Sequence, residues 1–125
     1  MKSSDFRKLI VWQKAMDLTI EVYSLVRLLP REESYCLSDQ MRRAVVSVPA
    51  NIAEGQGRDT DKEYNRFISI ARGSLWELLT QIEICERLSY ISTVQSAKAR
   101  DLITEISKML LALSNAITSN LKSNV

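Results

Sequence analysis

Apolar side chains recur at intervals of three and four residues along four separate stretches of this chain, and this periodicity restricts its fold more than any other feature. Such spacing gathers apolar residues on one face of an α-helix, where they form a buried stripe. Only 3 glycines and 2 prolines occur in 125 residues, so few positions interrupt a helix. We therefore expect helices over about 8–29, 38–55, 61–89 and 93–120.

Helix-capping patterns mark the ends of these segments. The residue before a proline is disfavoured in a helix, so Pro30 is expected to end the first one. Gly55 and Gly57 suit a left-handed cap at the end of the second helix. Two capping boxes open the third and fourth helices: Thr60 with Glu63, and Ser92 with Gln95. Because short connections make neighbouring helices run in opposite directions, the predicted fold is all-α, a single domain (1–125) forming an antiparallel up-down-up-down four-helix bundle.

The composition argues against several functional classes. A hydrophobic fraction of 46% and a charged fraction of 26% are typical of a soluble globular protein. The chain has no histidine and therefore lacks the commonest general base and the commonest metal ligand. It also lacks a glycine-rich phosphate loop and a Glu-x-x-His di-metal motif. We expect no catalytic residue, metal, cofactor or small-molecule substrate.

The sequence also indicates a cytoplasmic protein. Charges interrupt the segment MKSSDFRKLIVWQKA every few residues, which is unlike a signal peptide. No apolar run approaches the roughly 20 residues that a membrane span needs, so no membrane partner is expected. Cys36 and Cys85 are too few for a disulfide scaffold, and we expect both to be buried free thiols in a reducing compartment.

The segment from Arg42 to Gly57, RRAVVSVPANIAEGQG, has two apolar flanks and a polar seam. The seam residues fall within a stripe about 80° wide on a helix: Gln40, Arg43, Ser47, Asn51 and Glu54. One interpretation is a binding or catalytic cleft; we favour a buried hydrogen-bonded network that fixes helix register and subunit orientation. Arg43 and Glu54 lie about 16 Å apart along a helix, so each needs a partner elsewhere. Those partners are expected on another helix, and the candidates in the third helix are Glu63, Arg66, Glu77 and Gln81. Arg43 with Glu77 would form a bidentate pair if the helices run antiparallel.

One apolar flank of this helix is expected to serve the protomer's own core and the other a neighbouring subunit. The candidate subunit interface combines the second flank with a tryptophan of the third helix: Val46, Pro49, Ala50, Ala53 and Trp76. For Trp76, packing in the core is an equal alternative.

Two residues inside the expected helices need a special explanation. Pro49 leaves the Val45 carbonyl without its helical donor and is expected to kink the helix for packing, rather than to form a hinge or ligand site. Ser47 and Asn51 flank the kink and are placed to satisfy this carbonyl, directly or through water. Gly73 costs about 1 kcal/mol relative to alanine in a helix and is expected to permit a close helix crossing.

Basic residues form a candidate nucleic-acid surface, although the net charge is only +2. The candidate contacts are Arg42, Arg58, Lys62, Arg66 and Arg72. An ordinary solvated face is the favoured interpretation for a monomer. An oligomer would concentrate these weak patches into one electrostatic field, and binding would then be mainly to the phosphate backbone and sensitive to salt.

Three sequence blocks resemble a known family: LIVWQKAMDLTIEVY, QMRRAVVSVPANIAEGQGR and EYNRFISIARGSLWEL. Together they are similar to the four-helix bundle proteins first met as products of intervening sequences in bacterial 23S ribosomal RNA genes. The resemblance covers roughly residues 6–91. It implies a small bacterial cytoplasmic protein that forms a homopentamer. The family also resembles the accessory protein of diversity-generating retroelements, a strongly basic pentamer that binds nucleic acid and a reverse transcriptase.

These observations converge on a non-enzymatic, homo-oligomeric bundle whose cellular role is not established. Its main partner is expected to be itself, in the pentamer that the resemblance implies, and its expected role is that of an assembly or adaptor module. The alternative function is binding of RNA or DNA by the basic surface of the assembled ring. The weak positive charge favours the first hypothesis over the second.

Overall fold

The protein is described by a computed structural model, which covers residues 5–123 and the side chains of residues 5–119. Its elements are η1 (Phe6–Lys8), α1 (Ile10–Val26), η2 (Arg31–Glu33), α2 (Leu37–Gln56), α3 (Asp61–Arg87) and α4 (Thr93–Ser123). The two η elements are single 3₁₀ turns that precede α1 and α2. No strand occurs between residues 5 and 123, so the predicted all-α class is confirmed.

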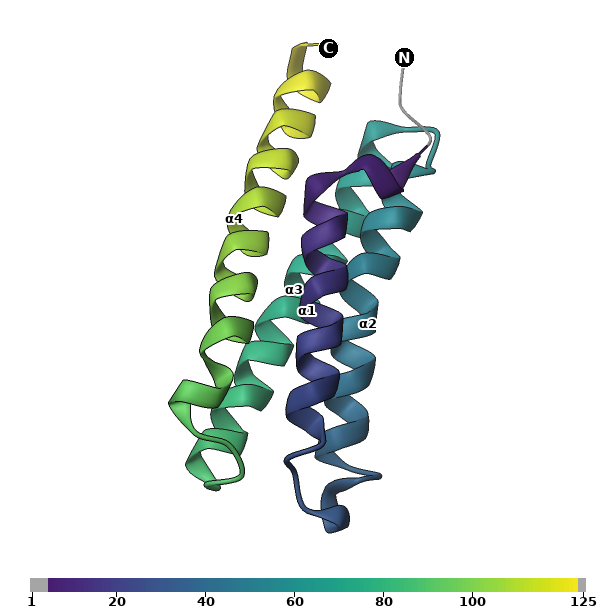
Figure 1. The fold of residues 1–125 in the computed structure, drawn as a ribbon. Helices are drawn as coiled ribbons and strands as arrows, with labels where there is room; N and C mark the ends of the chain where they lie inside the picture. Colours follow the sequence, from purple (N-terminus) through teal and green to yellow (C-terminus); the bar gives the residue numbers. More distant parts are fainter. Residues whose placement is uncertain (1–4, 124–125) are drawn as a thin grey trace.

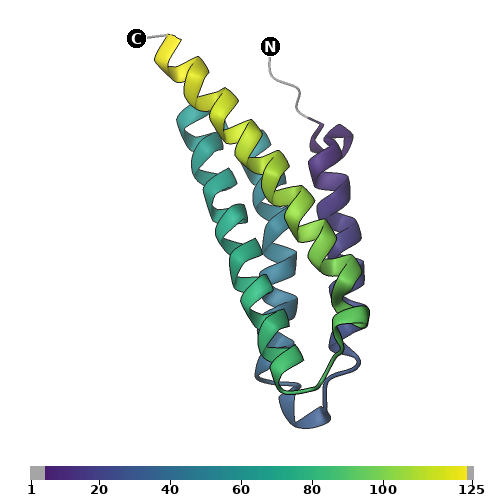
Figure 2. The same cartoon turned by 90° about the vertical axis from the view of Figure 1, so that its left-hand side faces the viewer.

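The four α-helices form a bundle in which each helix has two neighbours. α2 packs against α1 and α3, and α4 packs against α3 and α1. Figure 1 shows the α1–α2 and α3–α4 connections at one end of the molecule, and the α2–α3 connection at the other. Figure 2 shows α4 crossing the other helices obliquely, from a start beside α1 to last turns beside the beginning of α3. The adjacent helices α1 and α2 therefore form one side of the bundle, and α3 and α4 form the opposite side.

Side chains of both predicted capping boxes cap the starts of α3 and α4. The Thr60 hydroxyl accepts the Glu63 N–H at 3.2 Å at the start of α3. At α4 the box is reciprocal, because Ser92 Oγ accepts the Gln95 N–H at 3.0 Å and Gln95 Oε1 accepts the Ser92 N–H at 2.9 Å. Each box satisfies backbone donors that have no partner within the helix.

The expected ends of the first and second helices need correction. α1 ends at Val26, before Pro30, because the N–H groups of Leu28 and Leu29 bond carbonyls only three residues back, at 2.9 and 3.1 Å. Gly57 follows α2 with φ −83°, so the predicted left-handed glycine cap was wrong.

A serine instead takes the left-handed conformation, at the end of α3. Ser89 has φ 62°. There the Tyr90 N–H donates to the Cys85 carbonyl at 2.9 Å, and the Ser89 N–H donates to the Glu86 carbonyl at 3.0 Å. This pair of bonds is a Schellman cap, which closes the helix with a non-glycine residue at the left-handed position.

The core runs along the bundle axis and is built from the apolar stripes of all four helices. Its largest fully buried side chains are Leu18, Met41, Ile52, Ile68, Leu75, Leu78, Ile82, Ile103, Ile106, Leu110, Val22 and Val45. Full burial of one such side chain stabilises the fold by about 1.5–3 kcal/mol. No helix in the described part of the chain combines the length and the apolar character needed to cross a membrane.

The two cysteines differ in environment, so the prediction that both are buried was right for one of them only. Cys85 is buried, and its thiol lies 3.6 Å from the Met41 sulfur. Burial, together with the nearby carboxylates of Glu33 and Glu86, raises the pKa of the Cys85 thiol to about 11. Cys36 is exposed, because it occupies the N-cap position of α2 outside the packed stripes.

Candidate functional site

The polar seam of α2 makes one contact with the neighbouring helix, at its centre. The hydroxyls of Ser47 and Ser74 lie 2.8 Å apart and join α2 to α3. Asn51 Nδ2 donates to Ser47 Oγ at 2.9 Å and to the Ser47 carbonyl at 2.7 Å. The Asn51 amide thus binds Ser47 rather than the Val45 carbonyl that Pro49 leaves free. This small, half-buried cluster fixes the register of α2 against α3.

The outer parts of the seam are exposed, in contrast to the predicted buried network. Gln40, Glu54 and Glu77 are all exposed, and the Arg43 side chain is 80% exposed. The proposed Arg43–Glu77 pair was wrong: Arg43 Nε lies 3.2 Å from Asp39 Oδ2, and Glu77 accepts a hydrogen bond from Gln81. Each side chain finds its partner one turn away on its own helix, which requires no contact between helices.

An apolar surface lies along the outer side of the α1–α2 pair. Met16 and Ile20 are one turn apart on α1 and are 38% and 69% exposed, while Val46 on α2 is 43% exposed and Ala50 follows it by one turn. Tyr23, one turn after Ile20, and Arg42, one turn before Val46, line the same cavity between α1 and α2. Both stripes therefore flank one helix seam. We call this surface, formed by Met16, Ile20, Val46 and Ala50, the α1/α2 face.

The other residues of the candidate interface divide between the inside and the opposite side of the bundle. Pro49 is buried within the protomer and Ala53 is half-buried. Trp76 is 57% exposed and lines a cavity of about 250 Å³ between α3 and α4. We call this cavity the Trp76 groove; its lining includes Arg72, Leu79, Ile103, Lys108 and Leu111. Its lining thus combines apolar side chains with two cations, Arg72 and Lys108.

The close helix approach that was predicted at Gly73 occurs at Gly55. A Cβ atom added at Gly73 would meet nothing within 4 Å, because this residue faces solvent. A Cβ added at Gly55 would lie 3.0 Å from Phe67 Cβ and 3.0 Å from Tyr64 Cδ1. The last turns of α2 can therefore approach α3 closely only because residue 55 has no side chain.

The five predicted nucleic-acid contacts form one cluster of three residues and two separate positions. The guanidinium groups of Arg58 and Arg66 lie 4.7 and 5.5 Å from the centre of the Phe67 ring, which is cation–π geometry. Lys62 and Arg66 line a common cavity at the start of α3. Arg72 lies apart from them, in the Trp76 groove, and Arg42 lies near the beginning of α2.

Acidic partners reduce the positive potential of this three-residue cluster. Arg58 forms an ion pair with Glu54, and Arg66 Nη1 lies 3.4 Å from Glu63 Oε2. Both pairs link residues on the same surface and are largely exposed, so each contributes little to stability. Lys62 is exposed and has no ion pair within the described part of the chain.

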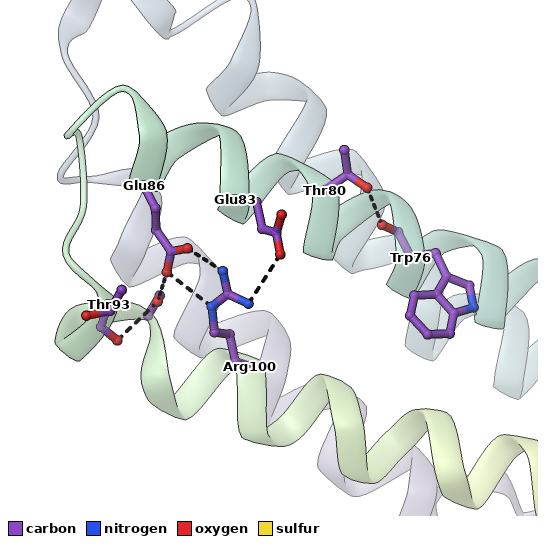
Figure 3. Close-up of polar contacts among 7 residues, drawn as sticks. Trp76, Thr80, Glu83, Glu86, Thr93 and Arg100 are labelled. Atoms are coloured by element: carbon purple, nitrogen blue, oxygen red, sulfur yellow. Dashed lines mark hydrogen bonds and ion pairs between the residues drawn. The ribbon is translucent and has the colours of Figure 1, made fainter.

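A charged cluster that the sequence analysis did not identify joins α3 to α4. Figure 3 shows Arg100 of α4 between Glu86 and Glu83 of α3. Arg100 Nε donates to Glu86 Oε2 at 3.1 Å, a second guanidinium nitrogen also binds Glu86, and Ser96 donates to the same carboxylate. The hydrogen bond from Arg100 lowers the pKa of the Glu86 carboxyl, although burial opposes this shift.

A second link ties the α3–α4 connection to η2. The Tyr90 hydroxyl donates to Glu33 Oε2 at 2.9 Å, and this bond to a carboxylate raises the pKa of Tyr90. The spacing of Glu86 and Arg100 around the turn after α3 was the available sequence signal for the first cluster. For the Tyr90–Glu33 link, no local sequence pattern relates the two residues.

Among the residues described, no three His, Cys, Asp or Glu side chains gather in a group that could hold a metal ion.

Comparison with known proteins identifies a family and several similar solved structures. A family model described as 23S rRNA-intervening sequence protein matches residues 7–112. No curated protein matches the chain. A solved structure of a protein of unknown function, from the S23 ribosomal protein family of Bacteroides thetaiotaomicron, is similar with a TM-score of 0.78 and 24% sequence identity. The match covers 84% of this chain and 98% of that one, and at this identity it shows the fold alone.

Proposed function

The chain belongs to the 23S rRNA-intervening sequence protein family, as its sequence blocks predicted, and on this basis we propose that it is a non-enzymatic assembly or adaptor module. In this proposal the antiparallel up-down-up-down bundle forms a homo-oligomer, a pentamer, in the cytoplasm. One observation carries the proposal: a single bundle has two exposed apolar surfaces, the α1/α2 face and the Trp76 groove, on opposite sides.

This arrangement suits a ring better than a two-fold dimer. A cyclic ring with more than two subunits is closed by heterologous contacts, in which one surface of a subunit meets a different surface of the next. Ile20 on one side and Trp76 on the other are large, exposed and apolar, and each gains about 25 cal/mol per Å² of apolar surface removed from water. Aromatic side chains such as Trp76 often contribute most of the binding energy at such contacts.

Three aspartate variants test the proposed contact: Ile20→Asp in the α1/α2 face, Trp76→Asp in the groove, and Val94→Asp as the control. Val94 is 84% exposed in the first turn of α4, outside both surfaces, and an acidic residue is favourable at a helix start. Native mass spectrometry is expected to show the oligomer for the control. Each of the other two variants is expected to dissociate to the 14.2 kDa subunit.

Mixing the two dissociated variants distinguishes the ring from a two-fold contact. Each variant retains the surface that the other has lost, so a heterologous contact predicts a one-to-one dimer in the mixture. If Ile20→Asp and Trp76→Asp both keep the wild-type mass, the two surfaces do not form the interface. A mixture that stays monomeric rejects the heterologous contact.

RNA or DNA binding is the second candidate function, and the cluster of Arg58, Lys62 and Arg66 around Phe67 favours it. A ring would repeat this cluster in every subunit and so strengthen its field. The ion pairs with Glu54 and Glu63, and a net charge of only +2, make it the weaker candidate.

Filter binding at low and moderate salt tests this second function. We expect Lys62→Gln to weaken retention of RNA or DNA. The slope of the logarithm of affinity against the logarithm of salt concentration should become shallower by about one. Arg87→Gln is the charge-matched control, because Arg87 is exposed at the far end of α3. The absence of retention at low salt, or equal losses in both variants, would contradict the assignment.

A further inference from the structure

Three arginines line a cavity of about 400 Å³ at the end of the bundle where α1 ends and α2 begins. Arg27 follows the last residue of α1, Arg31 opens η2, and Arg42 lies in the second turn of α2. None of the three has an ion pair among residues 5–119. Arg42 donates to the Ser34 carbonyl at 3.2 Å, which leaves its positive charge uncompensated.

The nearest carboxylates along the chain either are engaged with other partners or lie outside the cavity wall. Glu33 accepts the Tyr90 hydroxyl, and Asp39 pairs with Arg43. Glu32 is exposed on η2 and is not part of the cavity wall. The cavity is therefore lined by cations with no anion in its wall, an arrangement that attracts a negatively charged ligand.

The Ser38 hydroxyl adds a neutral polar group to the cavity wall. Ser38 is 4% exposed and lines this cavity, and its hydroxyl has no hydrogen-bond partner among the described residues. Its oxygen is not among the fully buried side-chain atoms that lack a partner, so the hydroxyl is open to the cavity and can bond a ligand oxygen there. Ser38 is also in the first turn of α2, where Cys36 gives no capping side chain. The 20-residue helix thus directs the positive end of its dipole toward this region.

The remaining wall of the cavity is apolar. Tyr23 is 40% exposed, and Val26 and Leu29 are buried beside it. Three guanidinium groups and a hydroxyl need more acceptor oxygens than the two of a carboxylate, whereas a phosphate group has three terminal oxygens. The Tyr23 ring offers a stacking surface to a planar organic group.

We propose that this cavity binds a small phosphate monoester, with the phosphate at Arg27, Arg31, Arg42 and Ser38 and the organic part against Tyr23. The site goes beyond the proposed assembly function and does not depend on it, because all of its residues come from one chain. It departs from the expectation that the protein has no small-molecule ligand.

Isothermal titration calorimetry of the full chain with adenosine 5′-monophosphate, inorganic phosphate and adenosine tests the proposal. We expect saturable binding of the monophosphate, weaker binding of inorganic phosphate and no measurable binding of adenosine. Arg31→Gln and, as a second variant, Arg27→Gln are each expected to weaken monophosphate binding about tenfold, the loss of one charge-assisted hydrogen bond. Both arginines are exposed, so these variants are expected to retain the helical circular dichroism signal.

Arg87→Gln is the matched control, since it removes the same charge outside the cavity. Arg87 is the last residue of α3, and α3 ends at the same end of the bundle as the α1–α2 connection (Figure 1). We expect it to change the affinity less than twofold. The proposal is overturned if the monophosphate does not bind, if inorganic phosphate binds equally well, or if Arg87→Gln weakens binding as much as Arg31→Gln. Amide NMR shifts on titration should centre on Ser38; shifts centred on Phe67 would equally overturn it.

Discussion

Replacing each helical glycine by alanine gives a sharp test of the packing between α2 and α3. Gly55→Ala adds a Cβ atom 3.0 Å from both Phe67 Cβ and Tyr64 Cδ1, and 3.3 Å from the Tyr64 carbonyl. Gly73→Ala adds the same atom where nothing lies within 4 Å. Both substitutions favour the helix because alanine reduces the conformational entropy of the unfolded chain. Only Gly55→Ala forces neighbouring atoms to move.

The expected magnitudes follow from these two contributions. Alanine is more favourable than glycine inside a helix by about 0.5–1 kcal/mol, so Gly73→Ala should raise the free energy of unfolding by that amount. Overpacking costs about 1–3 kcal/mol, so Gly55→Ala should lower the free energy of unfolding by about 1 kcal/mol after the helical gain. Because both variants share the helical gain, their difference isolates the contact of residue 55 with α3.

Urea unfolding followed by circular dichroism measures both variants under the same conditions. The protein concentration must be equal in all samples, because association would make the apparent stability concentration-dependent. We expect unchanged slopes and midpoints that shift in opposite directions. Two midpoints that move equally in the same direction would refute the close approach at Gly55.

Three further predictions concern the polar and sulfur-containing groups. Glu86→Gln should lower the free energy of unfolding by about 1 kcal/mol at neutral pH. Because the folded protein lowers the pKa of the Glu86 carboxyl from 4.5, the stabilisation by this carboxylate is present above pH 4.5 and is lost as the pH falls through the folded pKa. Urea unfolding should therefore show that the difference in stability between wild type and variant becomes smaller in acid. Iodoacetamide labelling followed by mass spectrometry should modify exposed Cys36 in the native protein and leave buried Cys85 unmodified until unfolding; equal rates would contradict the description of the core. Ser74→Ala should cost about 1 kcal/mol of unfolding free energy by removing the hydroxyl contact to Ser47, and no change in the urea midpoint would show that this contact does not stabilise the α2–α3 pair.

The sequence predicted the helices well because their signals are local. Apolar spacing of three and four identifies a buried face without knowledge of the neighbour. The capping boxes at Thr60 and Ser92 likewise need only residues three positions away. The left-handed cap at Ser89 was missed because glycine is the usual signal for that conformation, and this helix uses serine.

Contacts between helices were predicted less well, because sequence spacing does not reveal distances across the bundle. Arg43 was assigned a partner on α3, but Asp39, one turn away, satisfies it. Gly73 and Gly55 look alike in the sequence, and only the positions of Tyr64 and Phe67 decide which one permits a close approach. Arg27 and Arg31 were not recognised as site residues, because their common cavity with Arg42 forms only when α1 and α2 pack together.

The mass of the assembled protein in solution tests the central claim most directly. Native mass spectrometry or sedimentation equilibrium at micromolar concentration should give a pentamer of five 14.2 kDa subunits, about 71 kDa. A single species at the subunit mass would contradict the proposal that the α1/α2 face and the Trp76 groove join neighbouring copies of this chain.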